Sequence, residues 1–157
     1  MPCSDPVTRE EIPYLGGLSD DKLLKLQWCS AEALGLEVLF HDRLEDGASG
    51  PELFVIPAGQ LEIGSSSREF GHSRTEEPQQ LAVIDKPFAL GRFTITAQEW
   101  AQFEAATGWR FRSDLLFSRD LHPVMNIRHG DAEAYCLWLG EQTGEIYRLP
   151  TEQEWEY

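Results

Sequence analysis

The stretch that decides the fold is YRLPTEQEWEY, from Tyr147 to Tyr157. Pro150 has no backbone N–H and disfavours helix in the residue before it, so an extended segment is expected to end there. Thr151 stands three residues ahead of Glu154, which is the spacing of a capping box at a helix start. A helix is therefore predicted to begin at Thr151, with Trp155 as its first large apolar anchor.

The predicted helix at residues 151–157 is short, because the sequence stops in its second turn. Isolated helices shorter than about 12–15 residues are marginal in water, so this helix is expected to depend on docking. We therefore expect the chain to hold an incomplete domain.

Caps and apolar spacing predict three more helices. Ser19 and two following aspartates open a helix that should end at Gly35, so residues 19–35 form the first. A second Thr-x-x-Glu box opens a helix over residues 96–108, with Trp100 and Phe103 on one face. The third runs over residues 131–142, and its broad apolar surface is typical of a helix central to a core.

Strands are predicted between these helices. Two apolar runs, residues 53–56 and 61–63, flank the turn-forming residues 57–59 and predict a β-hairpin. Two further strands are expected at residues 81–84 and 88–95. The mixture of elements indicates an α+β fold.

The domain boundary is placed near residue 50. Residues 1–50 are predicted to form an amino-terminal arm with one helix, and residues 51–157 the domain proper. The stretch 41–51 is polar and rich in turn formers, so it is expected to be a linker or long loop. His41 and Asp42 within it are expected to be a solvated pair.

The composition argues against two classes of partner. Lys and Arg number 13 against 27 Asp and Glu, a formal charge of −14, which repels nucleic acid and anionic membranes. No apolar run of about 18 residues and no basic-then-apolar amino terminus is visible, so a cytoplasmic location is expected.

The three cysteines, Cys3, Cys29 and Cys136, form no CxxC or zinc pattern, and we expect free thiols in a reducing compartment.

Four stretches carry a resemblance to a known family. The opening segment resembles the RLPTEAEWEY signature of the formylglycine-generating enzyme, or sulfatase-modifying factor, family. Three others resemble that family in its own order, namely IPAGQLEIGS (56–65), EEPQQLAVIDKPFALGRFTITAQEWAQF (76–103) and HPVMNIRHGDAEAYCLWLGEQTG (122–144). The resemblance implies a variant of the C-type lectin-like fold, incomplete at its carboxyl end and preceded by a helical arm.

The resemblance also implies an activity and its limits. The family oxidises a sulfatase cysteine to formylglycine with copper and oxygen, and its paired catalytic cysteines and calcium loops lie in the carboxyl-terminal half. The resemblance therefore implies no catalytic residue and no metal ligand in this chain. Copper and calcium are expected only where the carboxyl-terminal half of the domain is present. The chain alone is expected to be inactive, and its partners would be a sulfatase-type peptide or a second protein chain.

Some residues match family positions one by one. His129 stands where the family has a tryptophan associated with the substrate groove, so it is either a groove-edge residue or an ordinary loop histidine. The others are expected to be structural, as caps and hydrogen-bonded pairs at element ends. They are Asp131, Arg148, Pro150, Thr151, Glu152, Glu154 and Trp155.

Two alternatives remain open from the sequence. The chain could be a non-catalytic lectin-like binding module, since a fold does not fix a function. In that case the loops at residues 65–78 and 109–122 would carry specificity. It could also be a half-domain that needs a second chain to complete its sheet.

Overall fold

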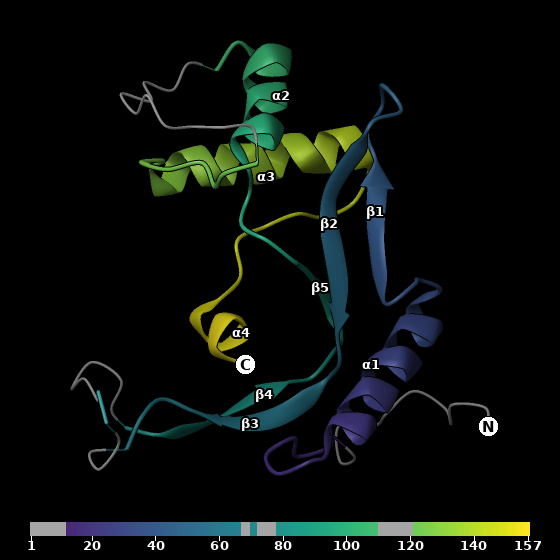
Figure 1. The fold of residues 1–157 in the computed structure, drawn as a ribbon, viewed down its shortest axis with the longest axis vertical. Helices are drawn as coiled ribbons and strands as arrows, with labels where there is room; N and C mark the ends of the chain where they lie inside the picture. The colour runs from purple at the N-terminus through teal and green to yellow at the C-terminus, as the bar shows by residue number, and fades with distance from the viewer. Residues whose placement is uncertain (1–11, 67–69, 72–77, 110–120) are drawn as a thin grey trace. The chain divides into compact units, whose positions relative to one another are not determined.

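The structure is a computed structural model that describes residues 12–66, 70–71, 78–109 and 121–157 (Figure 1). Most of the two loops expected at residues 65–78 and 109–122 lies outside the described residues. The elements are α1 (Asp20–Leu34), β1 (Leu39–Arg43), β2 (Ser49–Ile56), β3 (Gly59–Ile63), β4 (Gln80–Ile84), β5 (Phe88–Gly91), α2 (Ala97–Thr107), α3 (His129–Thr143) and α4 (Glu152–Glu156). This order confirms the mixed α+β class.

The strands form two sheets rather than one. One has three strands in the order β1-β2-β5, and the other pairs β3 with β4. The hairpin predicted around residues 57–59 is therefore wrong, since β2 and β3 belong to different sheets. The backbone groups of β3 bond instead to β4 and to residues 13–15, so the turn formers mark a passage between sheets. The strand expected at residues 88–95 is also shorter, because β5 ends at Gly91.

The chain divides into two compact units. The first comprises residues 1–38, 55–90 and 150–157, and the second residues 39–54 and 91–149.

The second unit begins with a hairpin where a polar loop was expected. β1 pairs with β2 in antiparallel register, with His41 opposite Glu52, and the register shifts between His41 and Arg43. Its turn contains Gly47 at φ 84° and Asp46, whose Oδ1 accepts from the Ala48 N–H at 2.8 Å. The prediction of a linker over residues 41–51 is therefore wrong, because Asp-Gly turn chemistry closes two strands there.

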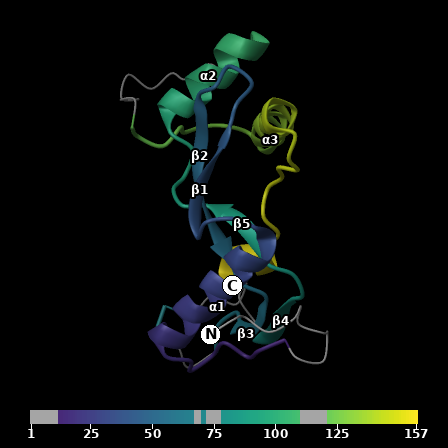
Figure 2. The ribbon, with the colours of Figure 1, turned by 90° about the vertical axis from the view of Figure 1, so that its right-hand side faces the viewer.

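Aromatic rings form the core of the second unit. α3 contacts both α2 and β1, and Figure 2 shows α3 nearly end-on. Trp100 stacks on Tyr135 at 5.4 Å between ring centroids, and Phe103 meets Tyr135 edge-on at 5.6 Å. The buried core residues are Leu44, Trp100, Phe103, Tyr135, Trp138 and Leu139. This confirms the predicted central role of the third helix and the buried face of α2.

The first unit is built on the β3–β4 ribbon. Gly59 lies opposite Ile84 and Leu61 opposite Ala82, so one face of the ribbon carries the buried side chains. The amino-terminal arm adds to the other edge of β3, where Gln60 N–H donates to the Pro13 carbonyl and Leu15 N–H to the Gln60 carbonyl, both at 2.8 Å. The arm thus behaves locally as a further strand.

α1 also belongs to the first unit. Its Gln27 Nε2 donates to the Val55 carbonyl of β2 at 2.8 Å, and Ala31 is its one buried residue. Leu24 and Trp28 of this helix are 61% and 52% exposed. The predicted helix is confirmed, but most of its large apolar side chains are not buried.

Candidate functional site

Tyr147, the first residue of the signature segment (residues 147–157), makes a long-range hydrogen bond. The Tyr147 hydroxyl donates to Asp42 Oδ2 of β1 at 2.5 Å, and both side chains are partly buried. Burial, together with this bond to the carboxylate, raises the pKa of Tyr147 well above its ordinary value. The expectation of a solvated Asp42 is wrong, because strand pairing turns its carboxylate toward Tyr147, 105 residues further along the chain.

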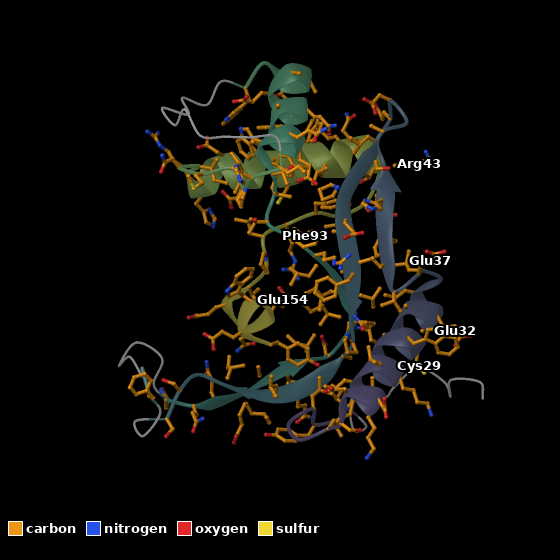
Figure 3. The ribbon with its side chains drawn as sticks, viewed as in Figure 1. Cys29, Glu32, Glu37, Arg43, Phe93 and Glu154 are labelled. Atoms are coloured by element: carbon orange, nitrogen blue, oxygen red, sulfur yellow. The ribbon has the colours of Figure 1, made fainter. Side chains whose placement is uncertain are left out.

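Thr151 and Glu154 form the predicted capping box of α4. Thr151 N–H donates to Glu154 Oε2 at 2.8 Å, and Glu154 N–H donates to Thr151 Oγ1 at 3.2 Å. Two free backbone donors at the helix start are thereby satisfied. Figure 3 labels Glu154 on this short helix.

The carboxyl end of α4 attaches to the β3 region. Glu156 Oε2 accepts from the Gly64 N–H at 3.0 Å, and the Tyr157 hydroxyl donates to the Pro57 carbonyl at 3.2 Å. A Cβ added at Gly59 would meet that hydroxyl and the side chain of Leu15. Burial raises the pKa of Tyr157 to about 12. The Tyr157 side chain therefore attaches α4 to the β3 region.

Trp155 does not anchor α4. Its side chain is 69% exposed, and α4 has no buried residue. The prediction of an apolar anchor is wrong because the helix presents Tyr157 and Glu156 to the ribbon, which leaves Trp155 outside the contact. An exposed tryptophan within the signature segment is thus a prominent apolar feature of the first unit.

His129 and Asp131 lie in the first turn of α3. His129 is exposed, with Nδ1 3.4 Å from Glu133 Oε2 one turn further on. Asp131 Oδ2 accepts from the Arg128 N–H at 3.0 Å, which is a capping contact. No buried partner fixes His129 among the described residues, so its position at a substrate groove stays a prediction.

Two further residues of the signature segment are Arg148 and Glu152. Arg148 Nη1 donates to the Leu149 carbonyl at 3.1 Å, and Glu152 is exposed in the first turn of α4. The structure places His129, Asp131 and Arg148 in the second unit, and residues 150–157 in the first.

A polar cluster that sequence reasoning missed lies on the β1–β2 hairpin. His41 Nδ1 donates to the Gly50 carbonyl at 2.9 Å, and its Nε2 lies 3.7 Å from Glu52 Oε1. Arg92 Nη1 donates to Glu52 Oε2 at 2.9 Å. The Arg92 guanidinium lies 5.0 Å from the centre of the exposed Phe93 ring. Figure 3 labels Phe93. Solvent screens these half-exposed charges, so the cluster reads as a surface ion-pair network.

The cysteines differ from expectation. Cys136 is free, as predicted, and burial followed by the charge of Glu133 raises the pKa of its thiol. Cys29 is disulfide-bonded, so the prediction of a free thiol there is wrong. Cys3 lies outside the described residues. A thiol with a raised pKa is a poor nucleophile and a poor metal ligand at neutral pH.

The described residues do not fit a copper or calcium centre. In residues 12–66, 70–71, 78–109 and 121–157 no three His, Cys, Asp or Glu side chains gather closely enough to hold a metal ion. Copper in its reduced state selects thiolate ligands. Burial raises the pKa of the Cys136 thiol, which disfavours the thiolate, and no second free cysteine is found in that part of the chain.

Within the described ranges, no helix combines the length and the apolar character needed to cross a bilayer.

Comparisons with known proteins agree with the segments quoted above. The sulfatase-modifying factor enzyme 1-like domain matches residues 40–157. The formylglycine-generating enzyme of Mus musculus is 36% identical over 144 residues, which cover 90% of this chain and 36% of that protein. The inactive C-alpha-formylglycine-generating enzyme 2 of Bos taurus is 26% identical over 148 residues, covering 65% of this chain and 46% of that protein.

A solved structure shares the fold. PvdO from Pseudomonas aeruginosa superposes with a TM-score of 0.61 at 29% identity, covering 73% of this chain and 47% of the PvdO chain. The chain thus spans less than half the length of each of these relatives.

Proposed function

Because the chain belongs to the sulfatase-modifying factor enzyme 1-like family, we propose that it supplies the scaffold part of a formylglycine-generating-type domain. The activity of the whole domain would be the oxidation of a sulfatase cysteine to formylglycine. Residues 40–157 would contribute the caps, the aromatic core and the Tyr147–Asp42 bond. The redox centre would come from the part of the domain that these residues do not match.

One observation carries this proposal. The family match covers residues 40–157, yet the free thiol described there, Cys136, is partly buried with a raised pKa and has no metal-binding neighbours among the described residues. A copper-dependent oxidase needs ionisable thiols that can reach the metal. The isolated chain should therefore be inactive, and copper and calcium would bind only to the completed domain.

The test uses the purified 157-residue chain. We expect no copper-dependent oxidation of a peptide containing CxPxR, measured by mass spectrometry of the cysteine, with the mouse enzyme as the positive control. Any turnover by the wild-type chain would overturn the argument, and a Cys136→Ser variant would then show whether the one free thiol described is responsible.

A non-catalytic binding module is the second candidate. It is favoured by the likeness to the bovine protein named as inactive, which has 65% of this chain aligned to it. In this case His129 would lie at the edge of a ligand groove, and a sulfatase-type peptide would bind without being changed. Binding of the CxPxR peptide by the completed domain without oxidation would support the binding module, and weaker binding by His129→Ala would support the groove.

A cytoplasmic location is a further proposal from the sequence. The disulfide at Cys29 weighs against it, because structural disulfides persist mainly in oxidising compartments. Thiol labelling of the protein as it is taken from cells would separate the two locations, since labelling of Cys29 requires a reducing compartment.

A further inference from the structure

The disulfide of Cys29 has one candidate partner within this chain. Cys29 is disulfide-bonded, and Cys136 is a free thiol. The sequence contains three cysteines, so the remaining one is Cys3, which lies outside the described residues. A bond between Cys3 and Cys29 would join the start of the chain to α1.

The length of the chain allows this bond. An extended segment spans about 3.3–3.6 Å per residue, so the chain between Cys3 and Ile12 can reach up to about 30 Å. α1 begins at Asp20 and rises about 1.5 Å per residue, which places Cys29 about 14 Å along the helix axis. Cys29 is half-buried, and Ala31 is the one buried residue of α1. The bond is therefore within reach, and small thiols in solution have access to it.

The arm that this bond would hold lies along β3. Gln60 N–H donates to the Pro13 carbonyl at 2.8 Å, and Gln60 Nε2 donates to the Ile12 carbonyl at 3.0 Å. Leu15 N–H donates to the Gln60 carbonyl at 2.8 Å. The carboxyl-terminal end of the arm continues into α1. A disulfide at Cys3 would fix its amino-terminal end to α1 as well, so the residues bound to β3 would be held from both ends.

The arm also reaches the place where α4 is attached. A Cβ added at Gly59 would meet the Leu15 side chain as well as the Tyr157 hydroxyl, so the two side chains close over the same glycine of β3. That hydroxyl donates to the Pro57 carbonyl, which is one of the bonds that attach α4. The arm, β3 and α4 all belong to the first unit. The position of the arm and the attachment of α4 are therefore linked through Gly59.

We propose that Cys3 and Cys29 form a redox-sensitive clip that keeps the arm on β3 and thereby supports the attachment of α4. The clip closes when the two thiols give two protons and two electrons to a disulfide oxidant such as oxidised glutathione, which leaves as two thiols. A dithiol reductant opens it again through a mixed disulfide. While the clip is closed, a detached arm gains less conformational freedom, so detachment is disfavoured. Both cysteines lie ahead of residue 40, where the family match begins, and the clip does not depend on the oxidase proposal.

Peptide mapping without reductant tests the bond itself. The full 157-residue chain is equilibrated with oxidised glutathione, its free thiols are blocked with N-ethylmaleimide, and it is cut with trypsin. We expect residues 1–9 and 26–43 to be recovered as one cross-linked peptide that dithiothreitol separates. The blocking group should be found on Cys136 alone, and the intact protein should keep the mass of one chain. Any other state of Cys29, whether unlinked, bonded to Cys136 or bonded to a second copy, would overturn the inference.

Hydrogen exchange of single backbone amides tests what the clip does. The amides of Leu15 and Gln60, which bond the arm to β3, should exchange at least about 10-fold faster when the wild-type chain is reduced with dithiothreitol. The Gly64 amide, which donates to Glu156 of α4, should also exchange faster, because the arm supports this helix. The Trp100 amide of the second unit should keep its rate.

Serine variants separate the bond from the packing of the cysteines. Cys3→Ser and Cys29→Ser, each without reductant, should reproduce the exchange rates of the reduced wild-type chain. The double variant should add nothing further, because both changes remove the same bond. Cys136→Ser is the matched control and should keep the slow rates.

Two results of these exchange measurements would overturn the proposal. Equal rates for the Leu15 amide in the oxidised and reduced wild-type chain would show that the bond does not hold the arm. Faster exchange at Leu15 with an unchanged rate at Gly64 would show that the arm does not support α4.

Discussion

Replacing Tyr147 by Phe tests whether the long-range bond to Asp42 stabilises the second unit. The change removes one hydroxyl, which donates to Asp42 Oδ2 at 2.5 Å, and keeps the ring. A hydrogen bond to a charged group contributes about 1.5–3 kcal/mol. Both partners are only partly buried, so the lower end of that range applies, about 1.5 kcal/mol. For a chain of this size the melting temperature should fall by about 3–6 °C.

The assay is urea unfolding of a double-mutant cycle. Tyr147→Phe, Asp42→Asn and the double variant are compared with wild type, and the coupling free energy should reach about 1 kcal/mol. Tyr14→Phe is the control, because the Tyr14 side chain is 47% exposed and its loss of a hydroxyl should be nearly neutral. A coupling free energy indistinguishable from zero would refute the reasoning, since the bond would then add nothing beyond the packing of the ring.

Two further predictions concern the first unit. Gly59→Ala should cost about 1–3 kcal/mol, because its Cβ would meet the Tyr157 hydroxyl and Leu15, whereas Gly130→Ala, with open space around it in α3, should be neutral or stabilising in the same thermal unfolding assay. The folded-state pKa of Tyr157 is raised from 10.0 to about 12, so the stability it contributes is complete below pH 10 and is lost as pH rises through about 12. Unfolding curves across that range should show a smaller loss in Tyr157→Phe, and identical losses would contradict the assignment.

Helices were predictable from the sequence because their signals are local. Both Thr-x-x-Glu boxes form as expected, and Gly108 ends α2 in the left-handed region at φ 71°. Capping residues lie within a few positions of the groups they satisfy, so the printed sequence contains both partners.

Strand partners and contacts across the chain were not predictable in the same way. Residues 57–59 have the composition of a turn, but the strands on either side pair elsewhere, because pairing is decided by long-range contacts. The bond between Asp42 and Tyr147 joins two polar residues with no spacing rule between them. The Asp46-Gly47 pair was a usable hairpin signal, and the lack of alternating apolar residues around it concealed the strands.

Trp155 shows a third limit of prediction from the sequence. An apolar residue in a helix predicts that one face packs, and here Tyr157, two positions later, makes that contact instead. The sequence indicates that one face of the helix packs, but it does not identify which residue makes the contact.

The pairing of residues 13–15 with Gln60 joins β3 to a segment outside the range that the family model matches. The family match starts at residue 40, yet the backbone bonds of β3 reach back to residues 13–15, and Gln27 reaches Val55. A chain trimmed to residues 40–157 would leave this edge of β3 unpaired, and an unpaired strand edge is a template for pairing with another chain and for aggregation. Any excision should therefore begin ahead of Ile12, so that these backbone bonds are kept.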